Sequence, residues 1–238
     1  MTCHLVALCF DANDPPRLAR FWAGLLGGET TEHPDGGVAL VLRDDPGFRL
    51  GFVPTQEPKT VPNAMHFDLT STSLDDQRET VARAVGLGAR HIDVGQGPDA
   101  DHVVLADPEG NELCVIEPGN GFLAGCGFVG AVSCDGSRET GHFWSAALGW
   151  PLVWDRDEET AIQSPEGGTK ISWGGPPLPP KTGKYRLHFD IAPDGEQQAE
   201  VDRLVSLGAT RVDIGQGDVS WVVMADPDGH EFCVLTPR

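Results

Sequence analysis

The chain has 238 residues, which is enough for one or two domains with a substantial core. Its 17 basic and 36 acidic side chains give a formal net charge of −19, which argues against nucleic acid and anionic membrane surfaces as partners. No apolar run is long enough to cross a bilayer, and the N-terminus lacks a signal-peptide pattern. The six cysteines lie mostly in apolar, strand-like runs without metal-finger spacing, which indicates reduced, buried thiols and a cytoplasmic protein.

The first predicted unit is a strand, a helix and three more strands. The first strand covers residues 2–10. Asn13 or Asp14 caps the helix, whose apolar residues recur at helical spacing from Leu18 to Leu25 before Gly27 stops it. Short strands near residues 29–33, 38–43 and 48–53 complete the unit.

The second predicted unit repeats this order and opens on the stretch MHFDLT at residues 65–70. Phe67 and its apolar neighbours take one face of this strand, while His66 and Asp68 take the other. Ser73 caps the next helix, and the sequence GLG closes it. Three strands follow near residues 90–94, 102–106 and 112–116.

The second half of the chain is a copy of the first. The repeated pairs are ARFWAGLLG with GHFWSAALG, PKT with PKT, MHFDLT with LHFDIA, GARHIDVGQG with GATRVDIGQG, and VVLADPEGNELCVI with VVMADPDGHEFCVL. They stand in the same order in both copies, which indicates two structurally equivalent domains. We therefore predict domains at residues 1–118 and 128–238 joined by a linker at 119–127, with the second copy's helices near 138–148 and 195–206.

Four strand-helix-strand-strand-strand units predict an α+β fold in which curved mixed sheets form cups and the helices lie outside. His188 and Asp190 of the second copy match His66 and Asp68 of the first. We expect these four polar side chains to point into the concave sides of their sheets. Phe67 and its counterpart Phe189 should then pack against helices, because exposing them while burying charge is costly.

In these motifs the chain resembles the vicinal oxygen chelate superfamily, which includes glyoxalase I, bleomycin-resistance proteins, fosfomycin-modifying enzymes and extradiol dioxygenases. It is most similar to glyoxalase-like domains in tandem. The resemblance covers nearly the whole chain and implies that two units pair into each eight-stranded cup. It does not indicate one reaction, since one fold hosts many activities.

The resemblance also implies where a metal would be held. The first strand offers His4 and the fifth offers His66, while the last strand has Cys114 where metal-binding relatives have a glutamate. A carboxylate, Glu112, lies two residues earlier on the same face, roughly 6–7 Å away. We expect one divalent transition metal (Zn, Ni, Mn or Fe) on His4, His66 and Cys114 or Glu112, with a thiolate favouring zinc.

Comparison of the copies predicts that the two cups differ. His4 corresponds to Phe128, and His102 corresponds to Trp221. The first cup would collect His4 and His66 for a metal, with His102 as a ligand-binding residue beside them. The second would hold His188 and Asp190 beside aromatic side chains, which suits a flat organic ligand. Two plainer alternatives stay open, core packing for Phe128 and Trp221 and a solvated surface position for His4.

Three functions follow from these candidate residues. The first is a metal-dependent lyase, isomerase or dioxygenase that acts on a small oxygenated substrate, with Glu112 or Asp68 moving the proton. The second is a metal-free protein of the bleomycin-resistance type that sequesters a flat hydrophobic molecule on Trp221, Trp173 and Phe128. The third is a metal-free enzyme that uses a His–Asp pair as acid and base. Asp68 and Glu112 have the alternative of a structural polar network.

The partner expected in each case is a small organic molecule, with neither nucleic acid nor membrane, and with the protein a monomer or homodimer. The residues do not decide whether units pair within one copy or across the two copies. That choice determines whether His4 shares a cup with Glu112 or with Glu231.

Overall fold

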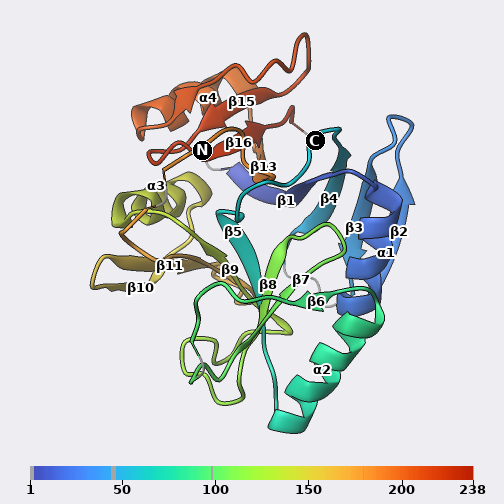
Figure 1. Ribbon diagram of the computed structural model, residues 1–238. Helices are drawn as coiled ribbons and strands as arrows, with labels where there is room; N and C mark the ends of the chain where they lie inside the picture. The colour runs from blue at the N-terminus through green and yellow to red at the C-terminus, as the bar shows by residue number, and fades with distance from the viewer. Residues whose placement is uncertain (1–2, 44–46, 98, 179, 238) are drawn as a thin grey trace.

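The computed structural model describes residues 3–43, 47–97, 99–178 and 180–237 (Figure 1). The first half contains β1 (Cys3–Ala12), α1 (Pro15–Leu26), β2 (Gly28–Glu32), β3 (Val38–Leu42), β4 (Arg49–Pro54), β5 (Met65–Leu69), α2 (Leu74–Gly86), β6 (Arg90–His91), β7 (Val103–Ala106) and β8 (Glu112–Val115). The second half contains β9 (Val129–Cys134), α3 (Arg138–Leu148), β10 (Leu152–Arg156), β11 (Glu159–Gln163), β12 (Lys170–Trp173), β13 (Leu187–Pro193), α4 (Gln197–Ser206), β14 (Thr210–Arg211), β15 (Val222–Ala225) and β16 (Glu231–Val234). The four predicted units are confirmed, although Thr2 of the first predicted strand lies outside the described residues.

Side-chain caps begin three of the helices where the sequence places them. Asp14 accepts a hydrogen bond from the backbone N–H of Arg17, and Ser73 and Ser137 do the same in α2 and α3. The sequence left Asn13 and Asp14 open as caps, and Asp14 takes the role. No helix in the described ranges combines the length and apolar character needed to cross a membrane.

The strand predicted over 90–94 is shorter, because β6 contains only Arg90 and His91. After His91 the chain turns out of the sheet. The carboxylate of Asp93 accepts from the N–H of Gly95, and the side-chain carbonyl of Gln96 accepts from Val94. The same bonds recur at Asp213 and Gln216 in the second copy. The repeated GQG stretches are therefore equivalent turns.

The strands form two eight-stranded mixed sheets, and each sheet takes one unit from each half of the chain (Figure 1). Sheet A has the order β14-β15-β16-β13-β1-β4-β3-β2, and sheet B has the order β10-β11-β12-β9-β5-β8-β7-β6. Antiparallel pairing of β1 with β13 and of β5 with β9 joins the units. Units thus pair across the copies, which answers the question that the sequence left open.

One hydrophobic core lies between the two sheets and takes in residues of all four helices. Phe67 of sheet B is 1% exposed, and its ring centroid lies 5.3 Å from that of Trp22 in α1. Phe189 of sheet A lies 5.3 Å from Trp144 in α3. The prediction that both phenylalanines pack against helices is confirmed, and the polar faces of these strands consequently look into the cups.

Each repeated tryptophan is also tied to the repeated DP turn of its own half. The indole N–H of Trp22 donates to Asp107 at 3.2 Å, and that of Trp144 donates to Asp226 at 3.1 Å. The FW and DP motifs therefore serve the core, where a buried indole N–H needs an acceptor. Each bond links a helix that packs on one sheet to a turn that follows a strand of the other sheet.

Candidate functional site

The concave face of sheet A encloses a cavity of about 380 Å³, a volume typical of small-molecule sites. Strands β1, β3, β4, β13, β15 and β16 line it, together with the turn between β2 and β3 and the GQG turn of the second copy. Aliphatic side chains and one tryptophan form much of the wall, among them Val53, Ile214, Trp221 and Val223. Trp221 is 39% exposed and stands at the rim, as a stacking side chain would.

A cluster of titratable side chains forms the polar part of this lining. One nitrogen, sulfur or carboxylate oxygen atom from each of Cys9, His188 and Asp190 could hold a metal ion, and these three atoms lie within 4.8 Å of one another. The thiol of Cys9 donates to Asp190 Oδ2 at 3.3 Å, and His188 Nε2 lies 3.5 Å from Asp190 Oδ1. Cys233 pairs with Asp190 on the next strand and also lines the cavity. His188 Nδ1 is buried and has no hydrogen-bond partner among the described residues.

The cluster favours a charged imidazole beside a charged carboxylate. Burial acts to lower the pKa of His188, but hydrogen bonds to Asp190, Cys233 and Cys9 outweigh it and raise the pKa well above 6.5. Burial acts to raise the pKa of Asp190, yet the bond to His188 and its charge leave that pKa lowered. Burial, followed by the charge of Asp190, raises the pKa of the Cys9 thiol to about 12.

A glycine leaves room beside this cluster. Gly51 of β4 pairs with Cys9 of β1, and a Cβ atom at Gly51 would stand 2.7 Å from Cys9 Sγ. At the equivalent place in sheet B, Ser172 of β12 pairs with Ser133 of β9, and their hydroxyls lie 3.3 Å apart. The space over Cys9 is therefore particular to sheet A.

Sheet B carries a matching cluster on its own concave face. Ligand atoms of His66, Asp68 and Cys114 lie within 4.8 Å of one another beside a cavity of about 810 Å³. Asp68 accepts a 2.6 Å hydrogen bond from Ser133, the residue that stands where sheet A has Cys9. Burial acts to lower the pKa of His66, but bonds to Asp68 and Cys114 raise it to about 10.

The linker between the halves covers part of sheet B. Leu123 packs in a cluster with Val104, Cys114, Ile116 and Ala131. Phe122 lies beside Lys170 of β12, whose ammonium group donates to the Phe122 carbonyl and stands 4.8 Å from the centre of its ring. The linker segment 120–126 therefore packs against strands of both units of this cup, whereas no linker residue lines the sheet A cavity.

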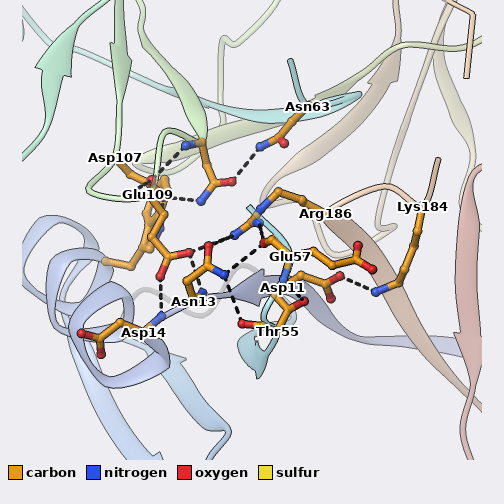
Figure 2. A network of polar contacts seen from close by, with 12 residues as sticks. Asp11, Asn13, Asp14, Thr55, Glu57, Asn63, Asp107, Glu109, Lys184 and Arg186 are labelled. Atoms are coloured by element: carbon orange, nitrogen blue, oxygen red, sulfur yellow. Dashed lines mark hydrogen bonds and ion pairs between the residues drawn. The ribbon is translucent and has the colours of Figure 1, made fainter. Parts of the chain in front are cut away.

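A polar network joins the two sheets next to the sheet A cavity (Figure 2). The carboxylate of Glu109, in the turn between β7 and β8, accepts from the backbone N–H groups of Asn13 and Asp14 at 2.8 and 2.7 Å. Arg186 donates to the same carboxylate at 2.9 Å and to the carbonyl of Glu57. In the second half, Asp228 is the equivalent carboxylate at the start of α3. It accepts from the backbone N–H of Ser137 and from the hydroxyl of Thr140.

A family model described as a glyoxalase-like domain matches two segments of the chain, residues 7–116 and 130–235. The chain belongs to this family. Glyoxalase 1 of Caenorhabditis briggsae is 28% identical over 102 residues, which is 39% of this chain and 36% of that protein. The chain thus matches little more than a third of that relative's length.

Solved structures share the fold across the whole chain. Glyoxalase I from Zea mays superposes with a TM-score of 0.63 at 12% identity, over 99% of this chain and 92% of that one. A protein described as a putative dioxygenase from Bacillus subtilis subsp. subtilis str. 168 gives a TM-score of 0.61 at 15% identity, over 99% and 85% of the two chains. The vicinal oxygen chelate fold expected from the motifs is thereby confirmed.

The glyoxalase-like cups distribute the predicted site residues in a way that the sequence did not indicate. His188, Asp190 and Trp221 line one cavity in sheet A. His66, His102, Glu112 and Cys114 line the other in sheet B, beside Asp68.

His4 joins neither cluster. It lies at the start of β1 in sheet A, before the irregularity between Leu5 and Ala7. Its side chain is 54% exposed, and Nδ1 lies 3.4 Å from Asp194. His66 belongs to the other sheet, so the expected metal pair of His4 and His66 is not assembled. The error follows from the pairing of units across the copies.

Two aromatic residues expected to bind ligand lie elsewhere. Trp173 is 1% exposed and belongs to the core, on the opposite face of β12 from the cup. Phe128 packs against the same core, with the guanidinium of Arg83 5.5 Å from its ring centre. Neither lines the two described cavities. Core packing, the plainer alternative left open for Phe128, applies to it, whereas the core position of Trp173 was not anticipated.

The lysine of each PKT motif is a feature that sequence reasoning missed. Lys59 Nζ lies 2.7 Å from Glu112 Oε1, and Lys181 Nζ lies 2.5 Å from Glu231 Oε1. The lysine and the glutamate both occur at equivalent positions of the two copies. This repetition of two opposite charges was the sequence signal that could have predicted the ion pair. Glu112 is therefore held in an ion pair, which supports the structural alternative for it.

Proposed function

We propose that the sheet A cavity is the working site of this glyoxalase-like protein, and that it binds a small oxygen-bearing organic molecule beside a divalent transition metal. The observation that carries the proposal is the Cys9–His188–Asp190 cluster in the lining of a largely apolar cavity that also presents Trp221. Functional sites of this size combine apolar walls with a few convergent polar groups.

The donor set is compatible with a metal. A thiolate, an imidazole nitrogen and a carboxylate oxygen are all zinc ligands, and three protein ligands leave a position for substrate or water. Cys233 supplies a second thiol on the neighbouring strand, and the unpartnered Nδ1 of His188 shows that this imidazole has bonding capacity to spare. Sheet B has Ser133 where sheet A has Cys9, so its donor set is one thiol poorer. Sheet A is consequently the better metal site.

A metal at this position would act as a Lewis acid toward an oxygen of the bound molecule. The protein's own residues would do the rest. Trp221 would stack on a flat body, and Ile214 and Val53 would help to exclude water. Glu231, the counterpart of Glu112, lines the same cavity. Lys181 and the backbone N–H of Tyr185 hold this carboxylate in place.

A second candidate is a metal-free binding protein or acid–base enzyme, and the ion pair of His188 with Asp190 favours it. An imidazolium already satisfied by a carboxylate can hold an anionic oxygen of a ligand without a metal. Ligand binding that is unchanged by a chelator would identify this case.

Calorimetric titration with Zn(II), Ni(II) and Mn(II) tests the proposal on protein purified without added metal or an affinity tag. We expect one tight site per chain that is lost in His188→Ala and weakened in Cys9→Ser. His66→Ala is the matched control, because it removes the equivalent imidazole of sheet B, and it should leave the tight site intact. Metal binding lost only in His66→Ala would overturn the assignment to sheet A, and absence of any tight site would support the metal-free candidate.

A further inference from the structure

Arg49 is a charged side chain of the sheet A cavity that has no counter-ion among the residues that the structure describes. It lies on β4, two residues before Gly51, and it lines the cavity beside Ala7 of β1. No ion pair or side-chain hydrogen bond involves Arg49 within the described ranges. A partly buried guanidinium offers five N–H donors in a planar fork that matches a carboxylate.

The carboxylates that line the same cavity already have partners. Asp11 pairs with Lys184, and Glu231 pairs with Lys181. Asp190 accepts from Cys9 and lies beside His188, while Asp35 accepts from the N–H of Gly37. The chain carries a large negative net charge, so a cation left free here is not explained by a general excess of basic side chains.

Sheet B shows what a cation at this position can hold. Lys170 is the register equivalent of Arg49, because Lys170 pairs with Ala131 as Arg49 pairs with Ala7. The linker supplies its partner. The carbonyl oxygen of Phe122 accepts from the Lys170 ammonium group, and the phenyl ring lies beneath the cation and edge-on to Trp154 at 6.0 Å. An aromatic body with an acceptor oxygen therefore already fills this place in one of the two cups.

We propose that the sheet A cavity takes an aromatic organic acid whose carboxylate binds Arg49, in the place that Phe122 fills on Lys170 in sheet B. This inference rests on the proposed ligand site and names its substrate class. Arg49 and Gly51 are one pleat apart, roughly 6–7 Å along the strand. A one- or two-ring acid therefore spans from Arg49 to the space beside Cys9, and a second oxygen on the ring would face the His188 cluster.

The test compares 2-naphthoate with 2-naphthamide, its uncharged analogue, by calorimetric titration of the protein as purified. We expect naphthoate to bind at least tenfold more tightly than naphthamide. Arg49→Met should abolish this preference, because it weakens naphthoate much more than naphthamide, and Arg49→Lys should keep part of it. Lys170→Met is the matched control at the equivalent position of sheet B and should leave the preference intact.

Trp221→Ala separates this inference from the proposed site. Equal binding of the two probes, with both weakened in Trp221→Ala, would overturn the organic-acid assignment and leave the cavity as a ligand site. A preference for naphthoate that disappears in Lys170→Met but survives in Arg49→Met would also overturn it. Failure of naphthoate to bind at all would count against the inference, while the metal titration would still decide the proposed function independently.

Discussion

His230 and Asn111 hold the same position in the two DP turns, and each donates its backbone N–H to the turn aspartate. Asn111 adds a side-chain bond to Asp107 at 2.8 Å, whereas His230 places Nδ1 3.5 Å from Asp226. Burial acts to lower the pKa of His230. The bond to Asp226 and the charges of Asp226, Asp228 and Asp135 outweigh it, so the pKa is raised above 6.5.

A raised histidine pKa makes stability depend on pH. Protonated His230 stabilises the fold fully below the unfolded-state pKa of about 6.5, and this contribution is lost as pH rises through the folded-state pKa. We expect His230→Asn, which copies Asn111 of the first half, to fold. As pH rises above 6.5, its free energy of unfolding should fall less than that of the parent protein. Urea unfolding at several pH values measures the difference, and parallel pH profiles would contradict the assignment.

Single residues also show what the sequence could predict about the site. Strict alternation fixed the faces of His66, Asp68, His188 and Asp190, because the side-chain period of a strand is local. The contacts that complete each cup join residues far apart in the sequence. Lys59 meets Glu112 across 53 positions of sequence, and Cys9 meets Asp190 across 181. Neither contact follows from the period of a strand, which is why the PKT lysines and the Cys9 ligand were missed.

The linker is the element whose role differs most from its appearance in the sequence. Its glycines indicated a plain connection, and among the described residues it contains neither helix nor strand. Nevertheless Leu123 is only 6% exposed, and Phe122 and Lys170 interact on the same concave face. Two apolar residues between glycines carry no period, so nothing local distinguishes a segment that packs on a sheet from one that only connects.

We expect Leu123→Ala to lower the free energy of unfolding by about 2–4 kcal/mol, because it leaves a cavity above Val104, Cys114 and Ala131. Val94→Ala is the matched control, since Val94 is an apolar residue that is 56% exposed, and its effect should stay within about 0.5 kcal/mol. Chemical denaturation measures both variants. A change of Leu123→Ala no larger than that of the control would show that the linker does not pack on sheet B in solution.

At the scale of the whole molecule, the exchange of units between halves decides which residues share a cup. Four units, their order and the location of the helices were predictable, since each depends on patterns within some fifty residues. The pairing of units was not, because β5 and β13 carry the same side-chain pattern and either could pair with the edge of β1. The structure chooses β13, and this places His188 with Cys9 and leaves His66 with Ser133.

This exchange predicts how the isolated halves behave. A fragment of residues 1–118 would keep the tie from Trp22 to Asp107, but β1 would lose its pairing with β13 and β5 its pairing with β9. Two exposed strand edges in one small fragment favour self-association. We therefore expect the fragment to form a homodimer or aggregate, and to form a one-to-one complex when refolded with residues 119–238. Light scattering after size exclusion, with thermal melting followed by circular dichroism, measures both states. A monomeric fragment that melts cooperatively would show that one half is stable alone, and that the pairing across copies is an addition to two self-sufficient domains.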